Sequence, residues 1–426
     1  MLQIYDLGMR MGRRAIFALS KTVRRNTASK FSRFILGQKR TLKEVASAAT
    51  RLDRSRPTLW LHAASLGEFG IARPIIRMLK EKCDCNIVVT FFSPTGYEAL
   101  MQKQPEGIDA VLYLPFDTSS NTRKFLNEIR PDCAVFMVSE YWHNYLHELH
   151  CRNIPTYLVS AVIRDNSPFF RWYGNLYRQS IKYFKEIFVL NERSHELLTE
   201  SGLKNVVING DPLFDNVALV ASTPWEDQVV KNFVGEGNKV FIAGSLHDDE
   251  DLELVTQLAN RHREVKFIIV PHEISASIMR HLQESLDGKI AFHSQSDADT
   301  DFNDTQILVI DFVGALAYIY RYANIAYVGG GFTKLLHSVI EPAVYGMPVA
   351  FGPNVSRKAV TRQMIKLGIG EIASTPDELE QWFEKFNNNP DKLREVSDKA
   401  AAFVNMNVGA TIRVVNKIQE DLCAKK

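Results

Sequence analysis

Residues 59–68 read Leu59-Trp60-Leu61-His62-Ala63-Ala64-Ser65-Leu66-Gly67-Glu68, an apolar segment that runs into a glycine turn. A segment with a helical pattern, residues 69–82, follows directly. Strand, turn and helix in this order are one step of an α/β fold, whose open sheets bind ligands at the carboxyl ends of their strands. Glu68 therefore lies where a carboxylate can act as a general base, beside a helix start that can hold an anion. The alternative is a structural role, because acids are favoured in the first turn of a helix.

The same alternation continues along the chain. From residue 57 onward, short apolar segments alternate with amphipathic ones, which indicates parallel strands joined by crossover helices. The first half contains seven predicted strands: 59–64, 87–91, 110–114, 133–138, 156–160, 186–190 and 206–208. The series stops near residues 210–212, and five more strands are predicted beyond a connecting helix: 240–243, 267–270, 306–309, 325–328 and 349–351.

Two consecutive halves of this kind predict an α/β fold with two Rossmann-like domains facing each other across a cleft, as in GT-B-type glycosyltransferases. Some nucleotide-sugar epimerases share that architecture, so the fold alone does not give the reaction. The predicted parts are a basic arm at residues 1–40, an N-terminal acceptor-binding domain at 41–214 and a C-terminal nucleotide-binding domain at 215–426 that ends in a helical tail.

The first 40 residues carry a large share of the positive charge. They hold ten Lys or Arg and one acid, Asp6, whereas the net charge of the whole chain is +2. Apolar residues are interleaved with these charges, and no apolar run approaches the ~20 residues that a spanning helix needs. The pattern predicts an amphipathic helix on an anionic membrane surface. A nucleic-acid-binding arm is the alternative, which the interleaved apolar residues disfavour, and Arg13 and Arg14 argue against a secretory signal.

Composition bounds the class of protein. Apolar residues make up 46% and charged residues 23% of the 426 positions, which is ordinary for a soluble α/β protein. The five cysteines are odd in number, and the lone pair Cys83 and Cys85 is a poor zinc signal. We therefore expect free thiols in a reducing cytoplasm and no metal site.

Three segments in the second half point to nucleotide binding. Gly244-Ser245-Leu246-His247 follows a strand, so that Gly244 permits close backbone approach and Ser245 and His247 can receive a phosphate, although a helix N-cap explains Ser245 equally well. Pro271 and His272 lie at another strand end, where they form either a wall of the site or a plain turn.

The third segment is rich in glycine. Gly329, Gly330 and Gly331 follow an apolar strand and allow a ligand to approach the backbone. Glu341 then falls in the first turn of a short predicted helix, where its carboxylate can accept hydrogen bonds from both hydroxyls of a ribose.

Taken together, these motifs resemble the Kdo transferases of lipopolysaccharide assembly over about residues 57–370. Kdo is an eight-carbon keto-sugar acid. The order of the motifs along one chain is more specific than any one of them. The landmarks are His62–Glu68, Thr90–Tyr97, Ser139-Glu140-Tyr141-Trp142, Val189-Leu190-Asn191-Glu192, Gly210–Asp215, Gly244–His247, the glycine segment and Ile340-Glu341-Pro342.

The resemblance implies an inverting transfer of Kdo from CMP-Kdo to the lipid A precursor, without metal or cofactor, at the cytoplasmic face of the inner membrane. It makes Glu68 the general base and Glu140 an acceptor-side residue, and we expect Ser65 and Gly67 beside the acceptor. The expected CMP contacts, from the motifs and the resemblance together, are Gly244, Ser245, His247, Pro271, His272, Val313, Gly314, Ala315, Gly330, Gly331, Ser338, Val339, Ile340 and Glu341.

The chain departs from the family pattern at several of these positions. The family usually has arginine at His272, asparagine at Ser338 and glutamate at Ala315, and an arginine of the pattern is Val162 here. The loop at residues 333–336 also lacks glycines that are common there. Two alternatives therefore stay open: a nucleotide-sugar epimerase, and a non-catalytic protein that binds nucleotide or lipid.

Overall fold

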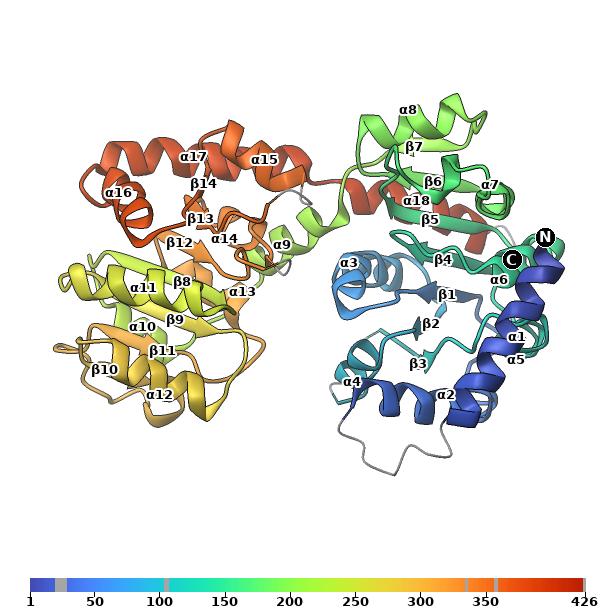
Figure 1. The fold of residues 1–426 in the computed structure, drawn as a ribbon, viewed down its shortest axis with the longest axis horizontal. Coiled ribbons are helices and arrows are strands. Elements are labelled where there is room, and N and C mark those ends of the chain that lie inside the picture. The colour runs from blue at the N-terminus through green and yellow to red at the C-terminus, as the bar shows by residue number, and fades with distance from the viewer. Residues whose placement is uncertain (20–28, 103–106, 334–335, 356–358, 424–426) are drawn as a thin grey trace. The chain divides into compact units, whose positions relative to one another are not determined.

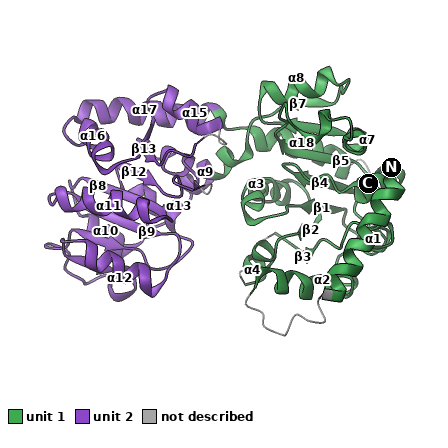
Figure 2. Cartoon of the chain, in the orientation of Figure 1, with its two compact units in different colours: residues 1–216, 407–426 green, residues 217–406 purple. Residues whose placement is uncertain are grey.

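The computed structural model describes residues 1–19, 29–102, 107–333, 336–355 and 359–423 (Figure 1). The chain divides into two compact units, residues 1–216 with 407–426 and residues 217–406 (Figure 2). Each unit has its own seven-stranded parallel sheet with helices on both faces, which confirms the predicted pair of Rossmann-like domains.

The sheet of unit 1 has the strand order β3-β2-β1-β4-β5-β6-β7. The order reverses direction between β1 and β4, and this switch point is where α/β sheets bind their ligands. The carboxyl ends of β1 and β4 carry the two predicted acidic residues, Glu68 and Glu140. The strands are β1 (Thr58–His62), β2 (Asn86–Phe91), β3 (Ala110–Tyr113), β4 (Cys133–Met137), β5 (Thr156–Ala161), β6 (Glu186–Val189) and β7 (Val206–Ile208).

Both faces of this sheet are covered, so its strands are apolar on both sides. Trp60 packs into one cluster with residues of α2, α5 and α6, whereas Leu59 and Leu61 pack into the other with residues of α3 and α18. The helices are α1 (Leu2–Leu19), α2 (Lys30–Ala49), α3 (Leu66–Lys82), α4 (Pro94–Gln102), α5 (Ser119–Ile129), α6 (His143–Cys151), α7 (Asn175–Ser180), α8 (Glu192–Glu200), α9 (Pro212–Ser222), which runs on into unit 2, and α18 (Ala410–Cys423).

The basic arm is folded onto unit 1 over its described part. The Tyr5 hydroxyl of α1 donates to buried Asp117 at 2.9 Å, and the Phe17 ring packs on Phe116. Helix α2 buries Ile35 and Gln38, and it continues past the predicted boundary at residue 40. Residues 20–28 of the arm lie outside the described residues. Among the helices described, none is long and apolar enough to cross a bilayer.

Unit 2 repeats the plan, with the order β10-β11-β9-β8-β12-β13-β14 and its switch point between β8 and β12. The sequence did not predict β10 and β14, because Ala291 interrupts the first and Gly370 and Glu371 the second, whereas the equally short edge strand β7 is entirely β-branched. The strands are β8 (Val240–Leu246), β9 (Lys266–Pro271), β10 (Ile290–Phe292), β11 (Ile307–Val309), β12 (Ile325–Val328), β13 (Val349–Phe351) and β14 (Gly370–Ile372).

The helices of unit 2 also cover both faces. Phe241 packs with residues of α11 and α16, and Ile242 packs on the other face with residues of α10 and α13. These helices are α10 (Gln228–Val234), α11 (Asp249–Arg261), α12 (Ala276–Ser285), α13 (Leu316–Ile319), α14 (Ile340–Ala343), α15 (Ala359–Lys366), α16 (Pro376–Asn387) and α17 (Pro390–Asn407).

The last helix differs from the predicted domain assignment. We expected residues 407–426 in the C-terminal domain, but they belong to unit 1. Asp215 accepts hydrogen bonds from the backbone of Gly409 and Thr411, and α18 then buries Val414 and Ile418 in the core beneath α3. An amphipathic helix does not reveal from its sequence which sheet it covers, so the assignment needed the structure.

Candidate active site

Glu68 sits at the mouth of the unit 1 sheet because β1 ends at His62 and α3 begins at Leu66. Ser65 is the N-cap of α3, and its hydroxyl accepts from the Glu68 backbone N–H at 3.4 Å. The Glu68 carboxylate reaches back and accepts the Ala64 backbone N–H at 2.6 Å. This reciprocal capping fixes the carboxylate at the end of β1.

The environment tunes Glu68 for proton transfer. Burial, and then the negative charge of Glu140, raise the pKa of Glu68 to about 7, against the lowering effect of the hydrogen bonds from the Ala64 and Ser65 backbone. A carboxyl group with a pKa near 7 is an effective general base at neutral pH, because an appreciable fraction is ionised and still basic.

Glu140 is held by a buried polar cluster. Its Oε2 accepts from Trp142 Nε1 at 2.6 Å and lies 3.3 Å from His62 Nε2. The other ring nitrogen of His62 lies 2.8 Å from Thr90 Oγ1, which also accepts from Trp60 Nε1 at 2.9 Å. Trp60, His62 and Thr90 are fully buried. The cluster fixes the Glu140 carboxylate, whose negative charge raises the pKa of Glu68.

Sequence reasoning did not assign roles to His62, Thr90 or Trp142. A signal existed, since His62 and Thr90 are polar residues in otherwise apolar strands and face each other in register across β1 and β2. Of the two expected acceptor contacts nearby, Ser65 is partly exposed and serves as the N-cap, whereas Gly67 is exposed and has open space beside it.

In unit 2, the end of β8 bulges at the predicted phosphate loop. The register with β9 shifts between Gly244 and Leu246, and Ser245 adopts a left-handed backbone conformation with φ 56°. A Cβ at Gly244 would meet the Tyr320 hydroxyl at 2.1 Å, so glycine is required there by packing. Burial, and then the Glu341 carboxylate, raise the pKa of Tyr320, which places Glu341 near the same tyrosine.

The glycine segment is tied to this loop by Asp251, a residue that sequence reasoning missed. Asp251 is the third residue of α11 and is fully buried. One of its carboxylate oxygens accepts from the backbone of His247, Asp248 and Gly330, and the other accepts from the Tyr327 hydroxyl at 2.7 Å. The Asp248-x-x-Asp251 spacing of a capping box was the available signal.

The glycines themselves have packing roles. A Cβ at Gly329 would lie 2.4 Å from the Ser245 carbonyl, and one at Gly331 would lie 2.5 Å from the Gly352 backbone. Gly330 has φ +83°, a conformation that favours glycine. The segment therefore packs backbone against backbone, with Gly330 at the turn.

Three histidines connect the predicted segments. The His247 and His272 rings lie 5.2 Å apart between centroids, and those of His272 and His337 lie 4.5 Å apart. The fold thus brings the end of β8, the end of β9 and the segment before α14 together. Beside His337, the Ser338 hydroxyl is buried and has no hydrogen-bond partner among the described residues.

The other expected CMP contacts differ in what they can offer. The side chains of Ala315, Val339 and Ile340 are buried in the core, so they can reach a ligand only through backbone atoms. Pro271 is also buried, at the end of β9. Val313 is 78% exposed, and Gly314 beside it has φ +98°, in the turn between β11 and α13.

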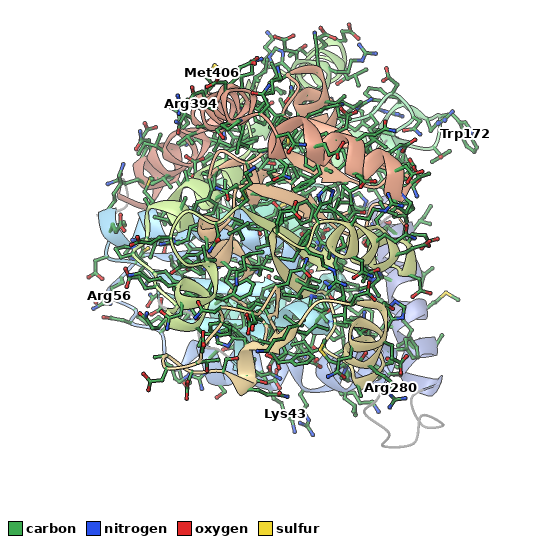
Figure 3. The ribbon with its side chains drawn as sticks, turned by 90° about the vertical axis from the view of Figure 1, so that its left-hand side faces the viewer. Lys43, Arg56, Trp172, Arg280, Arg394 and Met406 are labelled. Carbon is green, nitrogen blue, oxygen red and sulfur yellow. The ribbon has the colours of Figure 1, made fainter. Side chains whose placement is uncertain are left out.

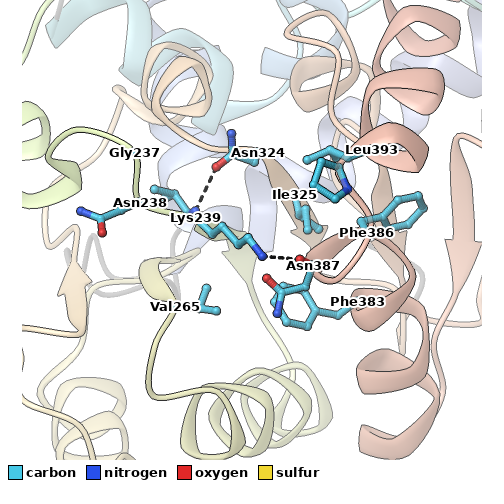
Figure 4. A pocket seen from close by; sticks show the side chains of 12 residues that line it. Gly237, Asn238, Lys239, Val265, Asn324, Ile325, Phe383, Phe386, Asn387 and Leu393 are labelled. Carbon is cyan, nitrogen blue, oxygen red and sulfur yellow. Dashed lines mark hydrogen bonds between the residues drawn. The ribbon is translucent and has the colours of Figure 1, made fainter.

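A cavity of about 410 Å³ lies at the opposite edge of the unit 2 sheet (Figure 4). Its walls include Val240 and Ile325, the first residues of β8 and β12, and it contains none of the predicted nucleotide contacts. The predicted site is therefore distinct from this cavity.

Comparison with known proteins relates part of the chain to one family. Residues 32–216 match the family model of 3-deoxy-D-manno-octulosonic-acid (Kdo) transferase. Over these residues, which are less than half of the chain, the sequence is therefore similar to the Kdo transferases. The chain is 25% identical, over 85% of its length and 86% of the relative, to a 3-deoxy-D-manno-octulosonic acid transferase of Haemophilus influenzae. The match to the family model includes both Glu68 and Glu140.

Two further similarities bear on length and fold. A bifunctional glycosyltransferase/methyltransferase of Fusobacterium nucleatum is 24% identical to the chain over 80% of the chain's length. The match spans only about half, 54%, of that relative. Among solved structures, UDP-GlcNAc 2-epimerase from Neisseria meningitidis superposes with a TM-score of 0.61 at 13% identity, over 85% of this chain and 100% of that one. That likeness to an epimerase shows the GT-B-type fold alone.

Proposed function

We propose that this chain is an inverting glycosyltransferase that moves Kdo from CMP-Kdo to the lipid A precursor. The observation that carries the proposal is Glu68: a half-buried carboxyl with a pKa of about 7, at the switch point of a domain that matches the Kdo transferase family model. Neither part suffices alone, because first-turn acids are common and a family match does not give a mechanism.

The proposed chemistry needs one proton transfer and one displacement. Ionised Glu68 takes the proton of an acceptor sugar hydroxyl as that oxygen forms a bond to the anomeric carbon of Kdo. The bond from the same carbon to the phosphate oxygen of CMP breaks, and CMP leaves with the electron pair. Attack on the face opposite CMP inverts the anomeric centre. Glu140, which is held by a hydrogen bond from Trp142 Nε1, accepts a hydrogen bond from a hydroxyl group of the acceptor sugar.

Unit 2 holds the nucleotide in this proposal. The bulged β8 end at Ser245 receives the phosphate, with His272 and His247 as further donors. The Glu341 carboxylate accepts hydrogen bonds from the ribose hydroxyls. The buried Ser338 hydroxyl, which lacks a hydrogen-bond partner among the described residues, lies three residues before Glu341 in the chain and can serve as an additional contact.

The proposed location is the cytoplasmic face of the inner membrane, where the arm binds anionic lipid. Support comes from α1, whose inner face packs on unit 1 while Ile4, Leu7 and Met11 are exposed at spacings that share one side of a helix. Trp172 of unit 1 is 91% exposed and projects from the surface (Figure 3). A tryptophan side chain suits a lipid–water interface, because its ring is apolar and its indole N–H can bind water.

A coupled assay tests the function. The chain is incubated with cytidine triphosphate, Kdo, the synthetase that makes CMP-Kdo, and the lipid A precursor, and the lipid is analysed by mass spectrometry. We expect the lipid mass to rise by one or more Kdo units. CMP binding without any mass increase would instead favour the non-catalytic alternative. Turnover of a UDP-sugar with no CMP binding would favour the epimerase.

A vesicle assay tests the location. Replacing Ile4, Leu7 and Met11 by serine should release the chain from anionic vesicles and reduce transfer to a vesicle-embedded acceptor more than to a detergent-dispersed one. Because α1 is packed on unit 1, this triple variant is preferable to deleting the arm. Serine at exposed Leu367 and Met406 is the matched control. Vesicle binding that is unaffected by the triple variant, or by salt, would contradict a membrane role.

A further inference from the structure

A histidine and two glutamates meet at the amino-terminal edge of the unit 2 sheet, away from the candidate active site at the carboxyl edge. His262 is the C-cap of α11, just before β9, and Glu380 and Glu384 are one turn apart on α16. One ligand atom from each of the three lies within 4.8 Å of the others. Residues four apart on a helix project from the same face, so both carboxylates can address one point.

The histidine is poised as a ligand. Its Nδ1 lies 3.4 Å from the Glu264 carboxylate, an arrangement in which Nδ1–H donates and the Nε2 lone pair is left available. The residue is 9% exposed, and Nε2 is buried with no hydrogen-bond partner in the part of the chain that the structure describes. A carboxylate on the distal ring nitrogen is the usual second shell of a metal-bound histidine, because it fixes the tautomer and raises the basicity of the ring.

The spacing of one ligand pair, His262 and Glu380, also fits a metal ion. His262 Nε2 lies 3.4 Å from Glu380 Oε1 without forming a hydrogen bond to it. Two ligands that are each about 2.0–2.1 Å from a tetrahedral zinc ion lie about 3.3–3.4 Å apart. The second oxygen of Glu380 accepts from Arg261, which also contacts Asp377 and so holds the Glu380 carboxylate in place.

We propose that His262, Glu380 and Glu384 bind one divalent transition-metal ion of the zinc class, with water completing the coordination. One imidazole and two carboxylates suit zinc and cobalt, and two carboxylates neutralise the charge of the ion. The ion would fasten α16 to the end of α11. Its role is structural, because the site lies at the opposite edge from the residues proposed for transfer, and the inference does not depend on the proposed function.

Cobalt titration tests the site directly. The full chain, free of any polyhistidine tag and stripped with chelator, is titrated with Co²⁺ and followed by its visible absorption. We expect one equivalent to bind with the bands of a four- or five-coordinate ion, and Zn²⁺ to displace it. Zn²⁺ should also raise the unfolding midpoint of unit 2 by at least about 2 °C, since a ligand of the native state stabilises it.

Two variants assign the ligands. His262→Gln and Glu384→Gln should each weaken Co²⁺ binding by at least about tenfold, and Glu384 is exposed, so its substitution spares the core. The controls are His281→Gln and Glu253→Gln, an exposed histidine and an exposed helix acid of the same unit. Binding that survives both ligand substitutions, equal losses in the controls, or no binding by the wild type overturns the proposal.

Discussion

The two units place an acid at the same position of the same motif and use it differently. In unit 1, Glu68 is the third residue of α3, behind the N-cap Ser65. In unit 2, Asp251 is the third residue of α11, behind the N-cap Asp248. Both helices follow the strand at the switch point of their sheet. The Glu68 carboxylate is stabilised only by the backbone of Ala64 and Ser65 among the described residues and is partly exposed, whereas Asp251 accepts four hydrogen bonds and is fully buried.

This difference separates an acid that can react from one that supports the fold. The donors around Asp251 stabilise its charge and leave no lone pair directed at a ligand. Glu68 is partly exposed and is influenced by the charge of Glu140, and its pKa is raised to about 7. Position in the first helical turn is therefore insufficient to assign a role, and the number of hydrogen-bond donors around the carboxylate is the more informative feature.

The sharpest test of the comparison is Glu68→Gln. We expect transfer to fall by about 10²–10⁴-fold, the usual cost of losing a general base, with CMP binding unchanged. The wild type should lose stability as the pH rises from about 4.5 to 7, because the Glu68 carboxyl ionises near its ordinary pKa of 4.5 in the unfolded chain but only at about 7 in the folded one. Glutamine cannot ionise, so the variant should lack that loss.

Glu378→Gln is the matched control. Glu378 is also the third residue of a helix, α16, and accepts the backbone N–H four residues before it, from Ser374 at 2.7 Å. It therefore reproduces the capping geometry of Glu68 outside the candidate site. Transfer within a few-fold of wild type in Glu68→Gln, or an equal loss in Glu378→Gln, would remove Glu68 from the proposed mechanism.

Asp251→Asn should have the opposite effect. The amide keeps one acceptor oxygen and turns an N–H₂ toward former donors, so at least two hydrogen bonds to a charged group are lost. We expect unit 2 to be destabilised by about 2–4 kcal/mol, with weaker CMP binding as the glycine segment loosens. Hydrogen exchange measured on peptides of each unit checks this. Unchanged protection of the Gly330 segment would show that Asp251 does not hold it.

Much of the fold could be predicted from the sequence, because both sheets are buried on both faces. Continuous apolar strands such as Leu59–His62 and Phe241–Ala243 are visible in composition alone. The short edge strands β10 and β14 contain residues that are poor strand formers, and the amphipathic α18 does not reveal which unit it covers. Such features depend on long-range packing.

The candidate site was only partly predictable. Glu68 was visible because a strand, a turn and an acid are adjacent in sequence. The cluster of His62, Thr90 and Glu140 forms from three strand ends that are far apart along the chain, and Asp251 acts on a loop about 80 residues away. The sequence shows that these polar residues lie at strand ends, but only the strand order shows which of them contact one another.

A smaller effect is expected at Glu341 in unit 2. If its carboxylate accepts the ribose hydroxyls, Glu341→Ala should weaken CMP binding by about 1.5–3 kcal/mol, the range for a charged hydrogen bond. Deoxycytidine monophosphate lacks one of the two hydroxyls and should lose much less on the same substitution. Calorimetric titration of both nucleotides measures this, and equal losses would indicate that Glu341 serves the protein rather than the ligand.

The smallest expected effect concerns the coupling that distinguishes Glu68 from Asp251. The Glu140 charge is the second cause, after burial, of the raised pKa of Glu68, so Glu140→Gln should lower that pKa. Transfer requires ionised Glu68, and the acid limb of the rate profile should therefore move to lower pH, by about half a unit to one unit. Trp142→Phe keeps the charge and should leave the limb near its wild-type position, even if the overall rate falls. A limb that stays in place or moves upward in Glu140→Gln would show that burial alone sets the pKa of Glu68, and would limit Glu140 to binding the acceptor.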